Sequence, residues 1–391
     1  MKMAPIRVAL VGLSASAKVT WAADAHLPYL LSSRGKKHYQ LVALLNSSVA
    51  AAESAKKTFD LPDVKAYGDP AALAADRDID LVVVNTRVDV HFSVVEPSIR
   101  AGKAVFIEWP LTENLARAIE LTKDQSVPGS IVGLQGRVMP LTLRLKEVLA
   151  SGIIGRVLNS EIRAFGNLMA RDGLPESLTY FADRKVGGHP INIHYGHMID
   201  YAHEVLGDWE AYDAKAQIQR SALKVFGGDG EVTGSITSDV PDFLSVHGTL
   251  KNNKDVVVPG ATLTVSFRLG QPFKNDPGFV WTINGEKGEL RVTAPGPYLM
   301  SGDSYNGPVT IEYYDHESDE VRELGWDWPV WQKELGLRAR STAELYERFA
   351  EWVEKGRPDV VEKRREWPRL EDGVALMREF DGLYKKIDPT W

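Results

Sequence analysis

The 391-residue sequence contains no cysteine. This excludes disulfide bonds, thiolate zinc sites and cysteine nucleophiles. The chain also has no run of 18 apolar residues, so we expect no membrane span. Basic residues give no excess, since 46 Lys and Arg stand against 53 Asp and Glu, and a nucleic-acid surface is not expected. Met1 to Arg7 lead into a strand-like run without the shape of a signal peptide, and we expect a cytoplasmic protein.

Hydrophobic content of 44% and charged content of 25% are ordinary for a globular chain, and the length favours two domains. In the first third, short apolar runs alternate with helical patterns. We expect strands at 6–11, 41–45, 80–85 and 104–107, and helices at 17–32, 49–59 and 91–101. Strands that alternate with helices indicate βαβ units, and continuous apolar strands indicate a parallel sheet that is covered on both faces.

The pattern changes after about residue 125. Leu263, Val265, Phe267 and Leu269 alternate with polar residues, which predicts a strand with one buried face. We expect helices at 140–151 and 341–355, strands at 279–283, 289–292 and 309–314, surface loops at 227–234 and 251–254, and a charged tail. The fold class is therefore α/β plus α+β: a Rossmann domain over 1–125, then a domain with a large, mostly antiparallel open sheet over 126–391. The C-terminal helix is a candidate to pack back on the first domain.

A glycine turn follows the first expected strand. Residues 12–17 read Gly-Leu-Ser-Ala-Ser-Ala, where a dinucleotide-binding fold has Gly-x-Gly-x-x-Gly/Ala. Gly12 and the final small residue match, while Ser14 replaces the middle glycine; Ser14 and Ala15 are candidate contacts of a pyrophosphate. The alternative is a tight turn that binds nothing.

The second expected strand ends at Asn46 and Ser47, without the carboxylate that an NAD-specific site usually carries. We therefore favour NADP over NAD and take both residues as candidate ribose contacts.

The strand end Glu108-Trp109-Pro110 resembles the Glu-Lys-Pro of the glucose–fructose oxidoreductase, inositol dehydrogenase and MocA (Gfo/Idh/MocA) family. Further similar segments follow in the family's order: Asn-Thr-Arg-Val-Asp-Val-His at 85–91, Gly-Lys-Ala-Val at 102–105, Gln-Gly-Arg at 135–137, Gly-Gly at 187–188 and Gly-His-Met-Ile-Asp at 196–200. Within the family the chain is most similar to the fungal galactose-regulon co-repressor branch. The resemblance implies NAD(P) binding, a sugar or sugar derivative as ligand, and a homodimer through the open sheet face.

Two departures from the family's pattern concern its acid–base chemistry. The family's lysine is Trp109 here, and its aspartate four residues before the helix histidine is Ile193. Loss of a general acid or base typically costs about 10²–10⁴ in rate. We therefore expect slow, atypical or redox-neutral chemistry, or none.

Candidate site residues fall into three groups. The catalytic candidates are His197, Tyr195, Asp183 and Lys185; the further cofactor candidates are Thr86, Arg87, His91 and Glu108; the substrate candidates are Trp109, Arg137, Arg163, His194 and Asp200. The alternatives are a core histidine, a solvated lysine, surface ion pairs for the arginines and simple packing for the indole. Four of the nine histidines lie within 189–203, but no further ligand is evident and we expect no metal.

Three functions remain open from the sequence. One is an NAD(P)-dependent oxidoreductase acting on a sugar. Another is a redox-neutral hydratase or lyase that needs proton transfer alone. The third is a non-catalytic sensor of a sugar or nucleotide, like the co-repressor branch.

Overall fold

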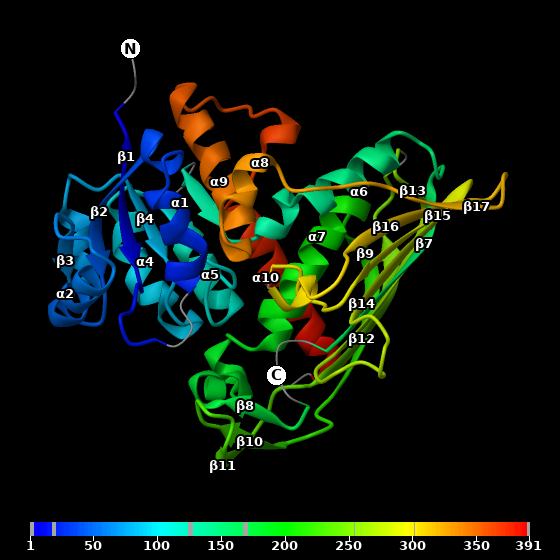
Figure 1. The fold of residues 1–391 in the computed structure, drawn as a ribbon, viewed down its shortest axis with the longest axis horizontal. Coiled ribbons are helices and arrows are strands. Elements are labelled where there is room, and N and C mark those ends of the chain that lie inside the picture. Colours follow the sequence, from blue (N-terminus) through cyan, green and yellow to red (C-terminus); the bar gives the residue numbers. More distant parts are fainter. Residues whose placement is uncertain are drawn as a thin grey trace. The chain divides into compact units, whose positions relative to one another are not determined.

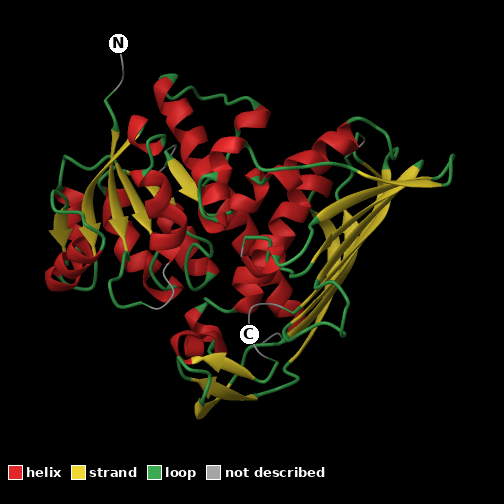
Figure 2. Cartoon of the chain, in the orientation of Figure 1, coloured by secondary structure: helices red, strands yellow, loops and turns green. Residues whose placement is uncertain are grey.

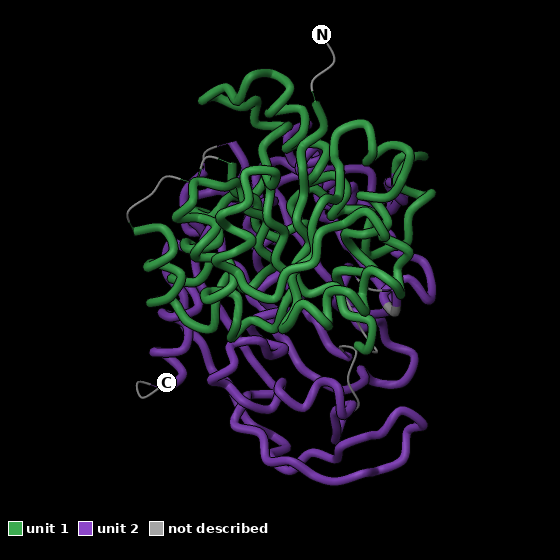
Figure 3. The backbone as a smooth tube through the Cα atoms, turned by 90° about the vertical axis from the view of Figure 1, so that its left-hand side faces the viewer, with its two compact units in different colours: residues 1–138, 329–378 green, residues 139–328, 379–391 purple. Residues whose placement is uncertain are grey.

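A computed structural model describes residues 4–17, 21–123, 127, 129–166, 171–253, 255–300 and 302–388. The chain divides into two compact units (Figure 3), which are described separately here: unit 1 comprises residues 1–138 and 329–378, and unit 2 comprises residues 139–328 and 379–391. The predicted division at residue 125 concerns domains that fold independently, and it stays a prediction. None of the described helices is long and apolar enough to cross a membrane.

Unit 1 is built on a six-stranded sheet (Figures 1 and 2). Its strands are β1 Ile6–Val11, β2 Tyr39–Leu45, β3 Lys65–Tyr67, β4 Leu81–Val84, β5 Ala104–Ile107 and β6 Ser130–Val132. Its α-helices are α1 Leu27–Leu31, α2 Val49–Thr58, α3 Pro70–Ala75, α4 His91–Arg100, α5 Leu115–Thr122, α8 Val330–Lys333 and α9 Leu337–Glu354. Every strand pair is parallel, in the order β3-β2-β1-β4-β5-β6. The predicted Rossmann-type sheet is confirmed, and its strand order reverses between β1 and β4.

Local sequence explains why these elements form. The four residues of β4 are all buried, as a strand covered on both faces requires. Helix α2 begins where Ser48 Oγ accepts a hydrogen bond from the backbone N–H of Ala51 at 3.1 Å. Helix α3 begins at Pro70, and Asp69 caps it through the backbone N–H groups of Ala71 and Ala72.

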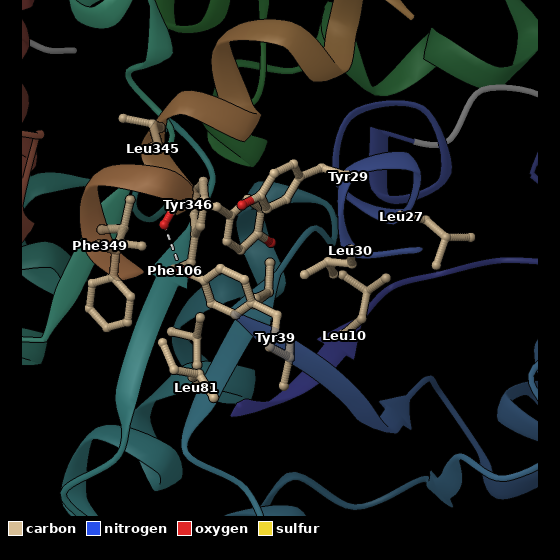
Figure 4. Packing of buried hydrophobic residues seen from close by; sticks show 14 of the residues in the cluster. Leu10, Leu27, Tyr29, Leu30, Tyr39, Leu81, Phe106, Leu345, Tyr346 and Phe349 are labelled. Carbon is tan, nitrogen blue, oxygen red and sulfur yellow. Dashed lines mark hydrogen bonds between the residues drawn. The ribbon is translucent and has the colours of Figure 1, made fainter. Parts of the chain in front are cut away.

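Helix α9 packs its aromatic side chains into the core of unit 1 (Figure 4). The ring of Tyr346 stacks on Tyr29 with centroids 5.3 Å apart and meets the edge of Tyr39 at 5.1 Å. The hydroxyl of Tyr39 donates to the carbonyl oxygen of Tyr346 at 2.7 Å. These contacts bind a helix from the last fifth of the sequence to the first two strands.

Unit 2 contains an eight-stranded sheet and a three-stranded sheet. The strands are β7 Val157–Phe165, β8 Gly173–Pro175, β9 Trp209–Gln217, β10 Ala222–Phe226, β11 Val232–Thr237, β12 Phe243–Leu250, β13 Val257–Arg268, β14 Phe279–Gly285, β15 Gly288–Ala294, β16 Thr310–Asp315 and β17 Glu320–Glu323. In the large sheet, ordered β17-β16-β15-β14-β7-β13-β12-β9, every pair except β7 with β13 is antiparallel. The predicted fold class is confirmed.

The period-two pattern of β13 has the predicted effect. Leu263, Val265 and Phe267 are buried, while the polar residues between them are half-buried. Helices α6 Pro140–Ala150 and α7 Gly196–Leu206 belong to the same unit, and Tyr201 of α7 lies 6.0 Å from Trp281 of β14, centroid to centroid. The buried face of the sheet is therefore covered by helix.

Several expectations about single elements are wrong. The region described as a charged tail forms helix α10 Leu370–Ile387, because Val374, Met377 and Phe380 recur on one helical face and are buried. The segment 227–234 is not all loop, since β11 begins at Val232. Strands β3 and β8 were not expected, and with three residues each they are too short to show a period. Residue 254 of the loop 251–254, and residues 18–20 of the first expected helix, lie outside the described residues.

Candidate functional site

The turn after β1 lies at the carboxyl edge of the parallel sheet, beside the loop after β4. Gly12 has φ of +87°, and a Cβ at this position would lie 2.9 Å from the carbonyl oxygen of Asn85 and 3.2 Å from Cγ2 of Thr86. Glycine is required both by the dihedral angle and by this close approach. Two loops therefore meet at the point where a Rossmann sheet binds a dinucleotide.

Three side chains around this point carry buried polar atoms that have no hydrogen-bond partner among the described residues. They are Asn46 Oδ1, both side-chain atoms Oδ1 and Nδ2 of Asn85, and Thr86 Oγ1. The Nδ2 of Asn46 donates to the carbonyl oxygen of Leu13 at 2.7 Å, which ties the end of β2 to the glycine turn. Buried polar groups without a partner are costly, so these atoms point to a polar ligand.

The remaining residues of the turn leave its outer side accessible. Ser14 Oγ accepts hydrogen bonds from the backbone N–H groups of Ala17 at 3.1 Å and Ser16 at 3.3 Å. Ala15 and, at the end of β2, Ser47 are exposed. A pyrophosphate and a ribose are the groups that such a surface fits, because a glycine turn brings backbone N–H groups close to an anion. The residues present therefore fit a nicotinamide dinucleotide.

His91 and Arg87 are already engaged within unit 1. The fully buried ring of His91 has Nε2 at 2.9 Å from the carbonyl oxygen of Thr86 and Nδ1 at 3.0 Å from that of Pro110. Burial lowers the pKa of His91 although the three nearby carbonyls oppose this. The exposed Arg87 forms a bidentate ion pair with Asp89, and this pair lowers the pKa of Asp89. His91 thus fixes the loop after β4 against the strand end after β5.

Glu108 belongs to a buried chain of three polar groups. Its Oε1 lies 2.9 Å from Nε2 of His26, and Nδ1 of His26 lies 2.8 Å from the hydroxyl of Tyr346. Burial, and then Glu108, raise the pKa of Tyr346 well above its usual value. We therefore infer that the phenol keeps its proton and donates to Nδ1, while Nε2–H donates to Glu108. A Cβ on Gly133 would lie 2.4 Å from Oε2 of Glu108, so only glycine leaves room for the carboxylate.

Replacing Tyr346 with phenylalanine tests this chain. We expect the variant to lose about 1–3 kcal/mol in free energy of unfolding, because Nδ1 of the fully buried His26 loses its donor. Urea unfolding measures the change. The matched control is Tyr314→Phe, whose hydroxyl pairs with Asp319 at the surface, and it is expected to change stability by less than about 0.5 kcal/mol. Equal losses in the two variants would contradict the proposed chain.

Trp109 is 4% exposed at the end of β5. So little accessible indole does not provide an open stacking surface in this conformation, and stacking on a sugar stays a prediction. No titratable group replaces the family's ammonium at this position, since an indole N–H only donates.

In unit 2, a π-helical turn, Ile191–Tyr195, leads directly into α7 and carries the predicted histidines. His194 and His197 lie on either side of Tyr298, with ring centroids 4.7 Å and 5.6 Å from it. His197 Nδ1 is buried and has no partner among the described residues. These two histidines are therefore brought together, as the sequence predicts for one helical face.

Burial controls the protonation of this cluster. It lowers the pKa of His189, His194 and His197 to about 3, and for His194 the neighbouring His197 adds to the effect. All three rings are neutral at pH 7. Tyr195 lies in the core against Phe267 and Phe380, and burial raises the pKa of its phenol. In this conformation a histidine of such low pKa is a weak base.

The other predicted residues are not gathered around the histidines. Asp183 and Lys185 are exposed, and Asp183 Oδ1 accepts from the backbone N–H of Lys185 at 2.9 Å as a helix cap. Arg163 pairs with Asp276 at 3.0 Å on the large sheet. Asp200 is buried in α7.

Two further observations concern the predicted binding residues. In unit 1, Arg137 pairs with Asp372 at 2.8 Å. The described residues contain no group of three or more His, Asp or Glu side chains placed to hold a metal ion.

Sequence reasoning missed His26, Tyr346, Tyr298 and Asn85. The first two are separated by 320 positions along the chain, so no local pattern connects them. Asn85 ends an apolar strand, and that position could have been noticed because ligands of open α/β sheets bind at the carboxyl ends of strands.

The geometry defines a class: a Rossmann-type nucleotide-binding unit joined to a unit with an open antiparallel sheet. The family model described as "Oxidoreductase family, NAD-binding Rossmann fold" matches residues 6–132. The model described as "Gal80p, C-terminal domain" matches residues 140–294.

Curated relatives agree with both models. Dehydrogenase aclE of Aspergillus oryzae is 32% identical over 304 residues, covering 75% of this chain and 78% of the relative. The galactose/lactose metabolism regulatory protein GAL80 of Kluyveromyces lactis is 27% identical over 307 residues, covering 75% of this chain and 65% of the relative. The chain therefore belongs to the Gfo/Idh/MocA oxidoreductase family, with a C-terminal domain like that of Gal80p.

Solved structures show the same fold. A super-repressor mutant of Gal80p from Saccharomyces cerevisiae has a TM-score of 0.84 at 23% identity and covers 98% of this chain and 96% of its own. Levoglucosan dehydrogenase, in complex with NADH and levoglucosan, has a TM-score of 0.72 at 16% identity, covering 98% and 97%. Enzymes and a transcriptional regulator thus share this architecture.

Proposed function

We propose that this protein is an NAD(P)-dependent oxidoreductase that acts slowly on a small hydroxylated molecule of the sugar class. The observation that carries the proposal is the cradle at the carboxyl edge of the parallel sheet. There Gly12 cannot carry a Cβ, and Asn46, Asn85 and Thr86 hold buried polar atoms without a partner in the described chain. Unsatisfied buried groups next to a glycine turn favour a bound dinucleotide.

Each part of the cradle has a proposed task. The backbone from Gly12 to Ala15 holds the pyrophosphate, Asn46 and Ser47 face the ribose, and Thr86 with Asn85 lines the path beyond. Arg87 contributes a charge at the rim, while His91 and Glu108 hold the loops in place through the contacts described above. The bound nicotinamide would supply the hydride chemistry.

NADP is favoured over NAD at this site. The end of β2 offers an amide and hydroxyls but no carboxylate, and a carboxylate is what would repel a 2′-phosphate. Asn46 is held in place by its bond to Leu13, so the group that meets the ribose is neutral.

The relatives support the class of reaction and substrate. One is named a dehydrogenase, and one solved fold neighbour holds NADH and the anhydrosugar levoglucosan. We propose that a sugar or sugar derivative binds at the residues of unit 2 around His194, His197 and Asp200, with Arg163, Arg137 and Trp109 as further candidates. We also propose a homodimer through the open face of the large sheet.

The proposed rate is low because the proton-transfer groups are poor. Trp109 and Ile193 replace the family's lysine and aspartate, and burial lowers the pKa of His197 to about 3. Tyr195 is retained as a proton donor by its raised pKa, whereas Asp183 and Lys185 would have to move from their exposed positions.

A non-catalytic sensor is the second candidate. The observation that favours it is the same loss of the acid–base pair, together with the likeness to the regulatory protein GAL80. In this function the dinucleotide or sugar would alter binding to a partner protein. A redox-neutral hydratase or lyase is a further outcome that the experiment below would detect.

The test begins with calorimetric titration of the purified protein with NADPH, NADP⁺, NADH and NAD⁺, and continues with a panel of sugars and anhydrosugars. Binding of NADPH together with slow change in reduced-nicotinamide absorbance supports the oxidoreductase. A product seen by NMR without that absorbance change indicates redox-neutral chemistry. Dinucleotide binding without turnover of any sugar indicates the sensor, and no dinucleotide binding contradicts the cradle.

Trp109→Lys restores the family's ammonium and is expected to raise the rate of hydride transfer by about 10²-fold, the lower end of what a general acid or base contributes. The matched control is Trp109→Met, which removes the indole without adding an amine. Dinucleotide affinity is measured for both variants to separate a binding effect from a rate effect. A rate no higher with lysine than with methionine would show that the missing ammonium does not limit the reaction.

A further inference from the structure

Unit 2 contains a cavity that is separate from the histidine cluster and that no function described above uses. Apolar side chains form most of its wall, among them Leu174 of β8, Leu223 of β10, Phe181 and Val240. Leu174 and Phe181 are themselves buried and belong to a small core under the three-stranded sheet. His194 and His197 do not line this cavity.

The polar part of the same wall is cationic. Arg171 and Arg220 line the cavity, and the only carboxylate among its lining residues in the described chain is Asp242. Both oxygens of Asp242 accept backbone N–H groups, from Gln219 at 2.7 Å and from Arg220 at 3.1 Å. The guanidinium of Arg220 is 3.7 Å from Asp242, so this contact is a loose ion pair and not a bidentate one.

Two more arginines increase the positive charge near this wall. Arg268 lies directly before the lining residue Leu269, and its Nε is buried with no partner among the described residues. Burial lowers the pKa of Arg268, and the charges of Arg171, Arg220 and Arg163 lower it further. Arg163 is neutralised by Asp276, but the other three cations have together one carboxylate in these contacts. An anion would relieve this repulsion.

The backbone holds the guanidinium of Arg171 in its place. Arg171 Nη2 and Arg268 Nη2 both donate to the carbonyl oxygen of Gln271 at 3.0 Å. A Cβ on Gly270 would lie 2.9 Å from Cγ of Arg171, so the chain of Arg171 packs directly on this glycine. The cationic end of the cavity is therefore built by the fold and does not depend on freely moving surface side chains.

We propose that this cavity binds a small monocarboxylic acid, with its carboxylate at Arg171 and Arg220 and its short apolar body against Leu174, Phe181 and Leu223. Guanidinium groups match the planar carboxylate, and the apolar wall excludes water from the body of the ligand. A bare inorganic anion would leave that wall uncovered. This proposal does not depend on the proposed oxidoreductase activity.

The experiment titrates the full chain with butyrate, its neutral isostere butyramide, and inorganic phosphate, using saturation-transfer NMR and calorimetry. Butyrate is expected to bind, and butyramide is expected to bind at least about 10-fold more weakly, since it lacks the charge that pairs with the guanidiniums. Arg220→Gln and Arg171→Gln should each weaken butyrate binding by about 10-fold to 100-fold. Arg364→Gln, an arginine 82% exposed in unit 1, is the matched control and should leave it unchanged.

Each other outcome overturns the proposal. Butyrate that does not bind at tens of millimolar, or that binds equally in both arginine variants, would show that the cavity is not a carboxylate site. Phosphate binding tighter than butyrate would assign the cations to an inorganic anion. Circular dichroism of each variant keeps loss of folding distinct from loss of binding, and the two separate arginine variants give independent readings.

Discussion

Acidification below pH 6.5 is expected to destabilise unit 2 by about 1.4 kcal/mol per pH unit for each of three buried histidines. The pKa values of His189, His194 and His197 are lowered from 6.5 to about 3 by burial. In the unfolded chain each ring takes up a proton near pH 6.5, whereas the folded chain resists protonation. The stability that these rings contribute is therefore complete above pH 6.5 and is lost as the pH falls towards 3.

The combined slope for three histidines is about 4 kcal/mol per pH unit, which is large against a typical total stability of about 5–15 kcal/mol. Urea unfolding between pH 7 and pH 5 measures this slope, with a probe in unit 2. His197→Gln should reduce it by about one proton, because glutamine does not titrate. The control His316→Gln alters an exposed residue and should leave the slope as it is. A slope that is the same in the His197 variant would mean that this ring is accessible to protons in the folded protein.

Removal of the Glu379 side chain is the second change for which we expect a large effect, a loss of about 3–5 kcal/mol in Glu379→Ala. Glu379 Oε2 lies 3.0 Å from Nε2 of His203, whose side chain is 7% exposed, and Oε1 accepts from Nε1 of Trp209 at 3.2 Å. The carboxylate thus connects α10 with the end of α7 and the start of β9. Without it, a buried imidazole and an indole N–H both lose their partner.

The loss from Glu379→Ala should depend on pH with a definite sign. Burial opposes the charge of His203, but the carboxylate of Glu379 outweighs burial and raises the pKa above 6.5. A raised pKa contributes stability that is fully present below pH 6.5 and is lost as the pH rises through the folded value. The penalty of the variant should therefore be largest at pH 6 and smaller at pH 9, where the lost bond to Trp209 remains.

Glu379→Gln and Glu371→Ala provide the comparison for this measurement. Glutamine retains an acceptor for Trp209 but not the charge for His203, so its penalty should be smaller than that of alanine at high pH. Glu371 is exposed at the start of the same helix, and its loss should cost no more than about 1 kcal/mol. A penalty in Glu379→Ala that does not change between pH 6 and pH 9 would show that His203 is neutral throughout.

The site divides in the same way into what local sequence predicts and what it does not. The glycine of the turn after β1 is readable because a positive φ and a strand-to-helix junction leave a local signature at Gly12. The histidines of the π-helical turn are readable as neighbours for the same reason. Glu108 was expected to face a ribose, but its partners His26 and Tyr346 come from distant positions, so their contact could not be predicted from spacing.

The sequence by itself determined the alternation of strands and helices in unit 1, the one-sided sheet of unit 2 and the family to which the chain belongs. These follow from residue periodicity and from motifs whose residues are neighbours along the chain. Tertiary structure alone decided that Tyr346 of α9 completes the first core, that His189, His194 and His197 are neutral, and that three arginines meet at one cavity. Protonation and charge repulsion depend on burial and on distances between remote segments, and neither is written in local sequence.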